Sequence, residues 1–226
     1  MEIYRKQDGL TFEPEGHRYT LDGKPLMSLT QILSAAGMID YSHVDPQVLA
    51  NKAAFGTKVH EYCLWSDQGE LDMDDLKPYP KYWNRVEGWR QFRRDFQFTP
   101  DLEWCEIPAA LKVNGMTYAL TVDRFGVMGP VDGREGFKPA IAVIELKTCA
   151  NGEPSHAIQT AGQALLFKGD GSVEIKRYGV YLLDKPNGGG KLYRAELHDD
   201  RMDEKIFLSA LTLTYWRLNH GLLKGM

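Results

Sequence analysis

A short apolar run near the middle of the chain places the strongest constraint on its fold. Residues 140–148 read Ala-Ile-Ala-Val-Ile-Glu-Leu-Lys-Thr, which begins like a strand buried on both faces of a sheet. Glu145 and Lys147 interrupt this pattern, and because they are two residues apart, their side chains leave the same face of the strand. A carboxylate and an ammonium at the end of a buried strand are costly to desolvate unless each has partners. The pattern predicts either a cross-strand ion pair, or a metal-binding carboxylate beside a lysine that steadies an anion or orients a water.

The preceding strand supplies a second carboxylate. In residues 118–123, large apolar residues alternate with small ones, and Asp123 continues the face of small residues. If the two strands are neighbours in the sheet, Asp123 and Glu145 can approach one cation. Mg²⁺ prefers carboxylate oxygens and retains several waters, so two carboxylates and a substrate phosphate are sufficient ligands. We therefore expect one or two Mg²⁺ ions, with Mn²⁺ able to substitute.

The remaining pattern predicts an α/β or α+β fold, in which helices pack on a central mixed sheet. A hairpin at residues 17–27 turns at Asp22-Gly23, and Ser28 and Gln31 have the spacing of a helix capping box. Residues 129–139 form a Gly- and Pro-rich loop. We expect helices at 28–36, 46–65, 79–98, 155–168 and 203–219, and strands at 103–113, 116–127, 140–148, 177–183 and 191–197.

We expect residues 1–226 to form a single domain of three parts. The hairpin and the first helices occupy residues 1–100, the sheet core occupies 101–198, and a closing helix occupies 199–226.

Two helical segments carry polar residues four positions apart, which places each pair on one helical face. In the first, Gly56 precedes His60, so that the helix can approach the sheet one turn before the imidazole. In the second, Gln159 precedes Gln163 beside small residues. Taken alone, the histidine is typical of a packing residue and the glutamines of an exposed polar face.

Together, these motifs resemble the PD-(D/E)XK nuclease superfamily. Asp123 followed by Glu145-Leu146-Lys147 is similar to its D…(D/E)XK signature, and residues 56–60 are similar to the GxxxH helix of the RecB-type branch. That branch includes phage exonucleases and the mitochondrial genome maintenance exonuclease. The resemblance spans residues 17–185 and implies a restriction-endonuclease-like core that carries the hairpin and helices at its N-terminus.

A third motif matches only in part. Gln159 matches the Gln of the family's QxxxY helix, but Gln163 replaces the Tyr, and Leu120 stands where the family often has Gly. In the family this helix supports the site and contacts the DNA strand. The replacement at Gln163 removes a stacking ring but keeps the capacity for hydrogen bonding.

The resemblance also implies roles for individual residues. The main ion would be held by His60, Asp123, Glu145 and the backbone carbonyl of Leu146. Lys147 would position the attacking water or screen the phosphate charge. Glu106, on the strand before Asp123, corresponds to an acidic residue often found near the metals, and it is either a ligand of a second ion or a plain surface carboxylate.

Cations are concentrated in one segment of a chain whose formal net charge is −4. The net charge argues mildly against a nucleic-acid partner, because phosphate contacts need Lys and Arg. The helix expected at 79–98 nevertheless interleaves aromatic residues with Arg85, Arg90, Arg93 and Arg94. We expect these arginines to follow a DNA backbone and the tryptophans to pack in the core, although a charge run alone is typical of a solvated face.

Other features argue against several classes of protein. No run of 18 apolar residues is present, and residues 1–9 lack the apolar stretch of a signal peptide. We therefore expect no membrane association and a cytoplasmic location, in the bacterial host cell if the chain is phage-encoded. Cys63, Cys105 and Cys149 predict free thiols and are fewer than the four ligands of an iron–sulfur cluster.

The function that follows is an Mg²⁺-dependent deoxyribonuclease, and specifically an exonuclease of phage or bacterial DNA recombination or repair. The alternatives are a structure-specific endonuclease, an inactive nucleic-acid-binding protein of the same fold, and a metal-dependent hydrolase of another substrate. DNA is the expected partner, together with a single-strand-binding or recombination protein. Polarity, the choice of DNA or RNA, strandedness and oligomeric state stay open.

Overall fold

The computed structural model describes residues 1–129, 139–169 and 175–223, so nearly all of the Gly- and Pro-rich loop expected at 129–139 lies outside the described residues. The helices are α1 (Leu29–Ala35), α2 (Pro46–Gln68), α3 (Pro80–Asp95), α4 (Pro154–Ala164) and α5 (Met202–Asn219), with 3-10 turns at Lys6–Asp8, Met73–Leu76 and Leu165–Phe167. The strands are β1 (Glu2–Tyr4), β2 (Leu10–Glu13), β3 (Arg18–Leu21), β4 (Lys24–Leu26), β5 (Phe98–Pro100), β6 (Ile107–Val113), β7 (Met116–Val122), β8 (Arg124–Met128), β9 (Ala140–Lys147), β10 (Ile175–Leu182) and β11 (Tyr193–Leu197).

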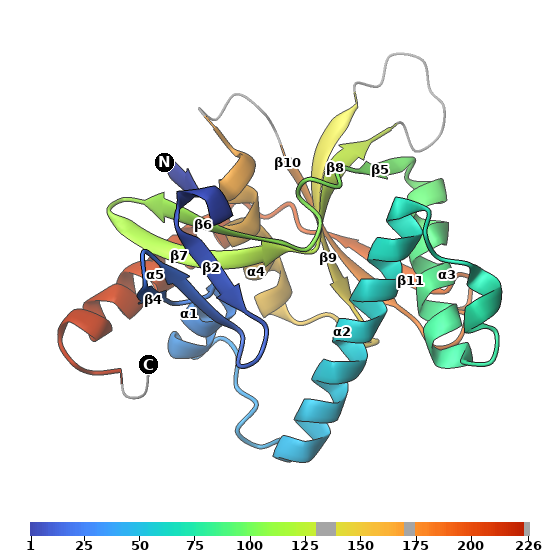
Figure 1. Ribbon diagram of the computed structural model, residues 1–226, viewed down its shortest axis with the longest axis horizontal. Coiled ribbons are helices and arrows are strands. Elements are labelled where there is room, and N and C mark those ends of the chain that lie inside the picture. The colour runs from blue at the N-terminus through green and yellow to red at the C-terminus, as the bar shows by residue number, and fades with distance from the viewer. Residues whose placement is uncertain (130–138, 170–174, 224–226) are drawn as a thin grey trace.

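Five strands form the central sheet, in the order β11-β10-β9-β8-β5. β9 and β10 are parallel, whereas the other neighbouring pairs are antiparallel. Helices cover both faces of this sheet: α4 and α5 lie on one side, and α2 and α3 lie on the other (Figure 1). The expected α+β fold with a mixed sheet flanked by helices is confirmed.

The two faces of β9 bury its side chains in separate hydrophobic clusters. Val143 packs with residues of α1, α4 and α5. Ile144 and Leu146 pack with residues of α2 and α3 on the opposite face. Because side chains alternate along a strand, Glu145 shares the face of Val143 and points toward α4.

The chain passes from one sheet into another at Asp123. β7 belongs to a three-stranded sheet of order β1-β6-β7, and β8 follows after this single residue and enters the central sheet. The single strand expected at 116–127 is therefore wrong. The break has a polar cause, because the Asp123 carboxylate accepts the Leu146 amide at 2.7 Å and the Asp123 carbonyl accepts from Arg124 at 2.6 Å.

Other expected boundaries also differ, and two of them have a clear structural reason. The helix expected at 79–98 ends at Asp95, because Gln97 adopts φ 47° and the buried Phe98 begins β5 opposite Met128. The strand expected at 103–113 begins only at Ile107, because Glu106 adopts the left-handed φ of 56°. Short strands such as β1, β2 and β5 lack a long apolar pattern and were not expected.

The N-terminal hairpin and the first helix form as the sequence predicts. Gln31 donates its amide to the Ser28 hydroxyl at 3.2 Å, and the Ser28 amide donates to the Gln31 side chain at 2.8 Å, which is a complete capping box. β2, β3 and β4 form a third sheet, whose Tyr19 packs against Ala110 and Ala119 of β6 and β7. The hairpin therefore packs against β7, the strand that leads to Asp123.

None of the helices in the described parts of the chain is both long and apolar enough to cross a membrane.

The close approach of α3 to β11 gives a test of this packing. A Cβ at Gly88 would lie 2.2 Å from the Leu192 carbonyl oxygen, and Gln91 accepts the Leu192 amide at 2.9 Å. We expect Gly88→Ala to lower the free energy of unfolding by about 1–3 kcal/mol, measured by urea denaturation. Gly188→Ala is the matched control, since a Cβ there would meet nothing within 4 Å. Equal stability of the two variants would contradict the close approach.

Candidate metal centre

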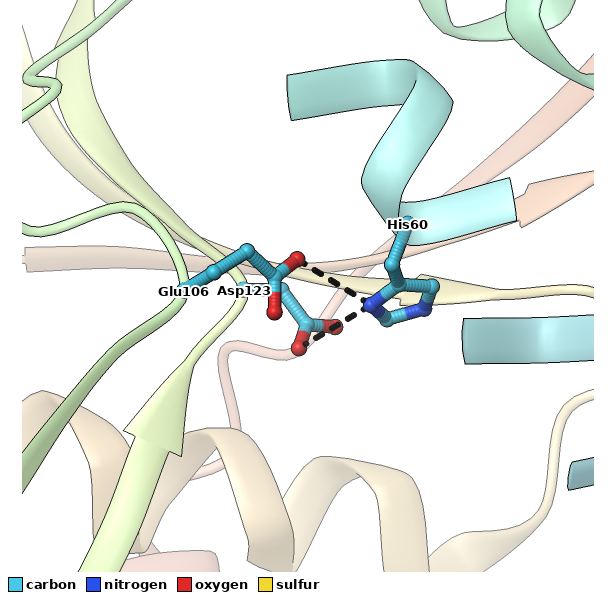
Figure 2. A group of neighbouring side chains, drawn as sticks. All are labelled: His60, Glu106 and Asp123. Carbon is cyan, nitrogen blue, oxygen red and sulfur yellow. Dashed lines mark hydrogen bonds and ion pairs between the residues drawn. The ribbon is translucent and has the colours of Figure 1, made fainter. Parts of the chain in front are cut away.

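Three side chains from separate elements meet at the break between β7 and β8 (Figure 2). His60 comes from α2, Glu106 from the turn before β6, and Asp123 from between the two strands. The His60 Nδ1 atom lies 3.2 Å from Glu106 Oε1 and 3.5 Å from Asp123 Oδ1. One ligand atom from each of the three lies within 4.8 Å of the others, so the cluster could hold a metal ion.

Local backbone geometry aims these side chains. α2 passes beside the end of β9, where a Cβ on Gly56 would meet Thr148 Oγ1 at an ordinary 3.7 Å, so the approach does not require glycine. Glu106 adopts φ 56°, a conformation that L residues rarely adopt, while its amide donates to the Val122 carbonyl at 2.8 Å. This turn directs the carboxylate toward His60.

Mutual burial shifts the ionisation of all three groups. Burial disfavours the imidazolium of His60, but the Asp123 and Glu106 carboxylates outweigh it and raise the His60 pKa to about 9. Burial, reinforced by the Glu145 charge, raises the Asp123 pKa to about 8. Burial opposes ionisation of Glu106, yet His60 and Arg124 lower its pKa. The cluster therefore retains protons that a divalent cation would displace.

A buried arginine holds the Glu106 carboxylate in place. Arg124 is fully buried and donates to Glu106 at 2.6 Å and to Asp67 at 2.6 Å. Asp67 also accepts from Trp89 at 2.8 Å and from Arg93 at 2.7 Å. The sequence pattern predicted no role for Asp67 or Arg124, and its one indication was a charged residue directly after Asp123 within an apolar run.

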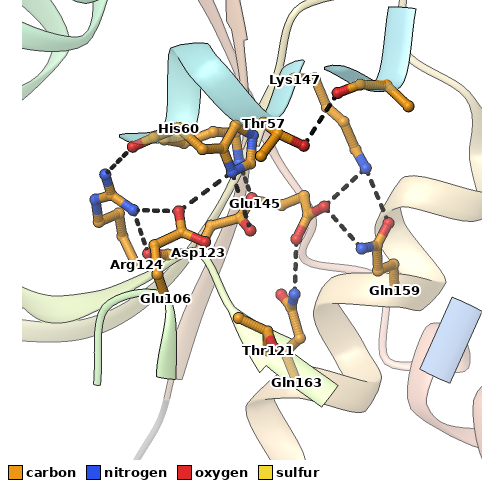
Figure 3. A network of polar contacts seen from close by, with 12 residues as sticks. Thr57, His60, Glu106, Thr121, Asp123, Arg124, Glu145, Lys147, Gln159 and Gln163 are labelled. Carbon is orange, nitrogen blue, oxygen red and sulfur yellow. Dashed lines mark hydrogen bonds and ion pairs between the residues drawn. The ribbon is translucent and has the colours of Figure 1, made fainter. Parts of the chain in front are cut away.

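Glu145 lies beside the cluster and is held by three donors (Figure 3). Its Oε1 accepts from Lys147 at 2.7 Å and from Gln159 at 2.7 Å, and its Oε2 accepts from Gln163 at 2.6 Å. Lys147 also donates to the side-chain oxygen of Gln159, Oε1, at 3.0 Å. Both glutamines thus face the site from α4, and the side-chain oxygen of Gln163 is buried without a partner among the described residues.

Most of the expected site residues line one cavity of about 770 Å³. In the antiparallel β8–β9 register, Arg124 lies opposite Ile144, so the adjacent pair of positions is Asp123 and Glu145. Side chains at opposite positions point to the same face, so both acids lie on one side of the sheet. Leu146 contributes its amide to Asp123, while its side chain packs on the other face. The residues that share the cavity are His60, Glu106, Asp123, Glu145, Lys147, Gln159 and Gln163, with Leu120 in its wall.

The basic segment of α3 lies outside this cavity. Arg85 pairs with Asp184 at 3.1 Å, and Arg94 pairs with Glu87 at 2.7 Å. Arg90 lines a second pocket of about 400 Å³ with Arg93 and Arg94. The expected contacts of these arginines with DNA stay a prediction. Trp89 packs in the core as expected.

No family model matches the chain, and no curated protein matches it. Among solved structures, the chain is similar to a protein from Eubacterium rectale described as a candidate exonuclease, with a TM-score of 0.41 and 10% sequence identity. The match covers 75% of this chain and 69% of that chain. At this TM-score the likeness assigns neither a family nor an activity to this chain.

Proposed function

We propose that this chain is a metal-dependent deoxyribonuclease that hydrolyses phosphodiester bonds, of the PD-(D/E)XK type and its RecB-type branch. The observation that carries the proposal is the shared cavity. The His60–Glu106–Asp123 cluster opens into the same space as the Glu145–Lys147 pair. A metal-binding group and a fixed ammonium beside one cavity are what a phosphoryl-transfer site requires.

The donor set fits a divalent cation of the Mg²⁺ and Mn²⁺ class. Glu106 and Asp123 offer carboxylate oxygens, which both ions prefer, and His60 adds an imidazole. When bound there, the ion would act as a Lewis acid on a phosphate oxygen and stabilise the leaving oxygen. Glu145 and the Leu146 carbonyl complete the ligand set that we propose from the family resemblance.

Lys147 screens the phosphate charge in this proposal. Burial disfavours its ammonium form, but the Glu145 carboxylate outweighs burial and raises the Lys147 pKa. The amine therefore stays protonated near neutral pH and serves as a cation rather than as a base.

The proposed mode is exonucleolytic, in phage or bacterial DNA recombination or repair, with a single-strand-binding or recombination protein as a partner. A structure-specific endonuclease is the alternative within the same chemistry. A binding protein without catalysis is less favoured, because Glu145 is a buried carboxylate that is costly to desolvate and Lys147 is held beside it at 2.7 Å in the same cavity as the cluster.

Removal of the Lys147 charge should abolish most of the activity. We expect Lys147→Met to be less stable than the wild type but still folded, because Gln159 and Gln163 continue to donate to the buried Glu145 carboxylate. Circular dichroism checks the fold, and the folded variant should cleave DNA with Mg²⁺ about 100- to 1,000-fold more slowly, because transition-state charge loses its counter-ion. Cleavage of labelled DNA with and without EDTA measures this. Lys112→Met is the matched control, since Lys112 pairs with Glu2 at 3.1 Å on another sheet. Full activity of Lys147→Met would refute the assignment.

Removal of the His60 imidazole should weaken metal binding and reduce the number of protons released when the metal binds. His60 and Asp123, with pKa values near 9 and 8, must lose protons when a cation binds, so affinity should rise with pH over this range. Calorimetry of Mn²⁺ binding at neutral pH in two buffers of different ionisation enthalpy should show proton release. We expect His60→Ala to lower affinity at least about tenfold and to release fewer protons.

The exposed His43 supplies the control for this experiment, as His43→Ala. If His60→Ala binds Mn²⁺ as tightly as the wild type does, His60 is a packing residue.

The mode of cleavage can be tested directly. An exonuclease should degrade end-labelled linear DNA and leave covalently closed circles intact, because closed circles present no end. We expect this result with Mg²⁺ and with Mn²⁺, and no cleavage in EDTA, as gel electrophoresis would show. Linearisation of the closed circles would instead favour the endonuclease.

A further inference from the structure

The cavity has two walls of different chemistry. One wall carries the charged groups described above, with Lys147 next to the metal-binding cluster. The other wall is the β2–β3 hairpin, which no step of the proposed reaction uses. The hairpin residues that line the cavity are Phe12, Pro14, His17 and Tyr19.

The aromatic rings of this hairpin are held at a fixed place relative to the cluster. Tyr19 is buried, and its hydroxyl lies 2.8 Å from Thr121 Oγ1, two residues before Asp123. Phe12 packs on Tyr19 with ring centroids 4.6 Å apart. His17 contacts Phe12 edge to face at 5.2 Å and is exposed. Phe12 and His17 therefore present ring surface to the cavity on a wall anchored next to the cluster.

The charge of the hairpin does not suit a phosphate. The connection between β2 and β3 contains Glu15, and β2 ends at Glu13. The β2–β3 hairpin also carries the cation Arg18, but Arg18 pairs with Glu13 at 3.0 Å. A phosphate would thus be drawn to the opposite wall, where Lys147 and a bound cation lie.

We propose that the β2–β3 hairpin is the base-binding wall of the site, where a nucleobase stacks on Phe12 and His17 while its phosphate lies at the cluster. This inference rests on the proposed nuclease function. Bases can stack on side chains only when they have left the duplex stack, and every base offers a π-face to an aromatic ring. The substrate class is therefore an unpaired nucleotide of a single DNA strand, held without strict sequence preference.

The size of the cavity agrees with this substrate. Its volume of about 770 Å³ is in the range of sites that enclose one small ligand, about 300–1,000 Å³. Such a space accepts one to a few nucleotides of a single strand.

Binding and cleavage are measured separately to test this. Fluorescence anisotropy with Ca²⁺ in place of Mg²⁺ compares a labelled oligothymidylate with an abasic strand of equal length. We expect Phe12→Leu to lower affinity for oligothymidylate about fivefold or more and to leave affinity for the abasic strand unchanged, because only base stacking is lost. His17→Asn should act in the same direction, and it preserves the turn because Asn tolerates the left-handed φ of 51° at this position.

A matched control removes an exposed ring elsewhere. Trp216 is half exposed and stacks on His220 at 4.5 Å, outside the cavity, so Trp216→Ala should leave both affinities unchanged. Wild-type affinity of both hairpin variants for oligothymidylate, or an equal loss for the two strands, would overturn the base-binding wall. Failure of the wild-type protein to cleave DNA with Mg²⁺ or Mn²⁺ would instead overturn the proposed function, so the two failures are distinguishable.

Discussion

A single hydrogen bond, from the Leu146 amide to the Asp123 carboxylate, fixes the relation between the two halves of the site. It closes the point where β7 leaves one sheet and β8 enters the central one. A side-chain oxygen thereby satisfies a buried backbone donor that a continuous strand would have paired with a carbonyl. One oxygen of Asp123 is engaged in the fold while the other faces His60, so the same carboxylate joins the two sheets and takes part in the candidate metal cluster.

Each buried charge around this point is balanced by oppositely charged or hydrogen-bonding side chains. Arg124 is enclosed by Asp67 and Glu106, and Glu145 is enclosed by Lys147 and two amides. Removing one member of such a set leaves an uncompensated buried charge, which costs far more than a surface pair is worth. The site is consequently preorganised by the same contacts that join α2 and α3 to the sheet.

Sequence alone predicted the parts of this structure that depend on local spacing. The alternation of β9 placed Glu145 and Lys147 on one face, and the spacing of Ser28 and Gln31 identified the capping box, because both features involve residues close in the chain. The pairing of Asp67 with Arg124 joins residues 57 positions apart and leaves no periodic signal. Likewise the break at Asp123 arises from its contact with β9, which no pattern within residues 116–127 encodes.

The turn before β6 sets backbone stability against the composition of the candidate metal cluster at one position. Glu106 holds a backbone conformation that glycine or asparagine would adopt at lower cost, and such strain is on the order of 1–3 kcal/mol. Replacing Glu106 by either residue would relieve this backbone strain and would remove a carboxylate from the cluster. A relaxed backbone and a complete His60–Glu106–Asp123 cluster therefore make opposite demands on residue 106.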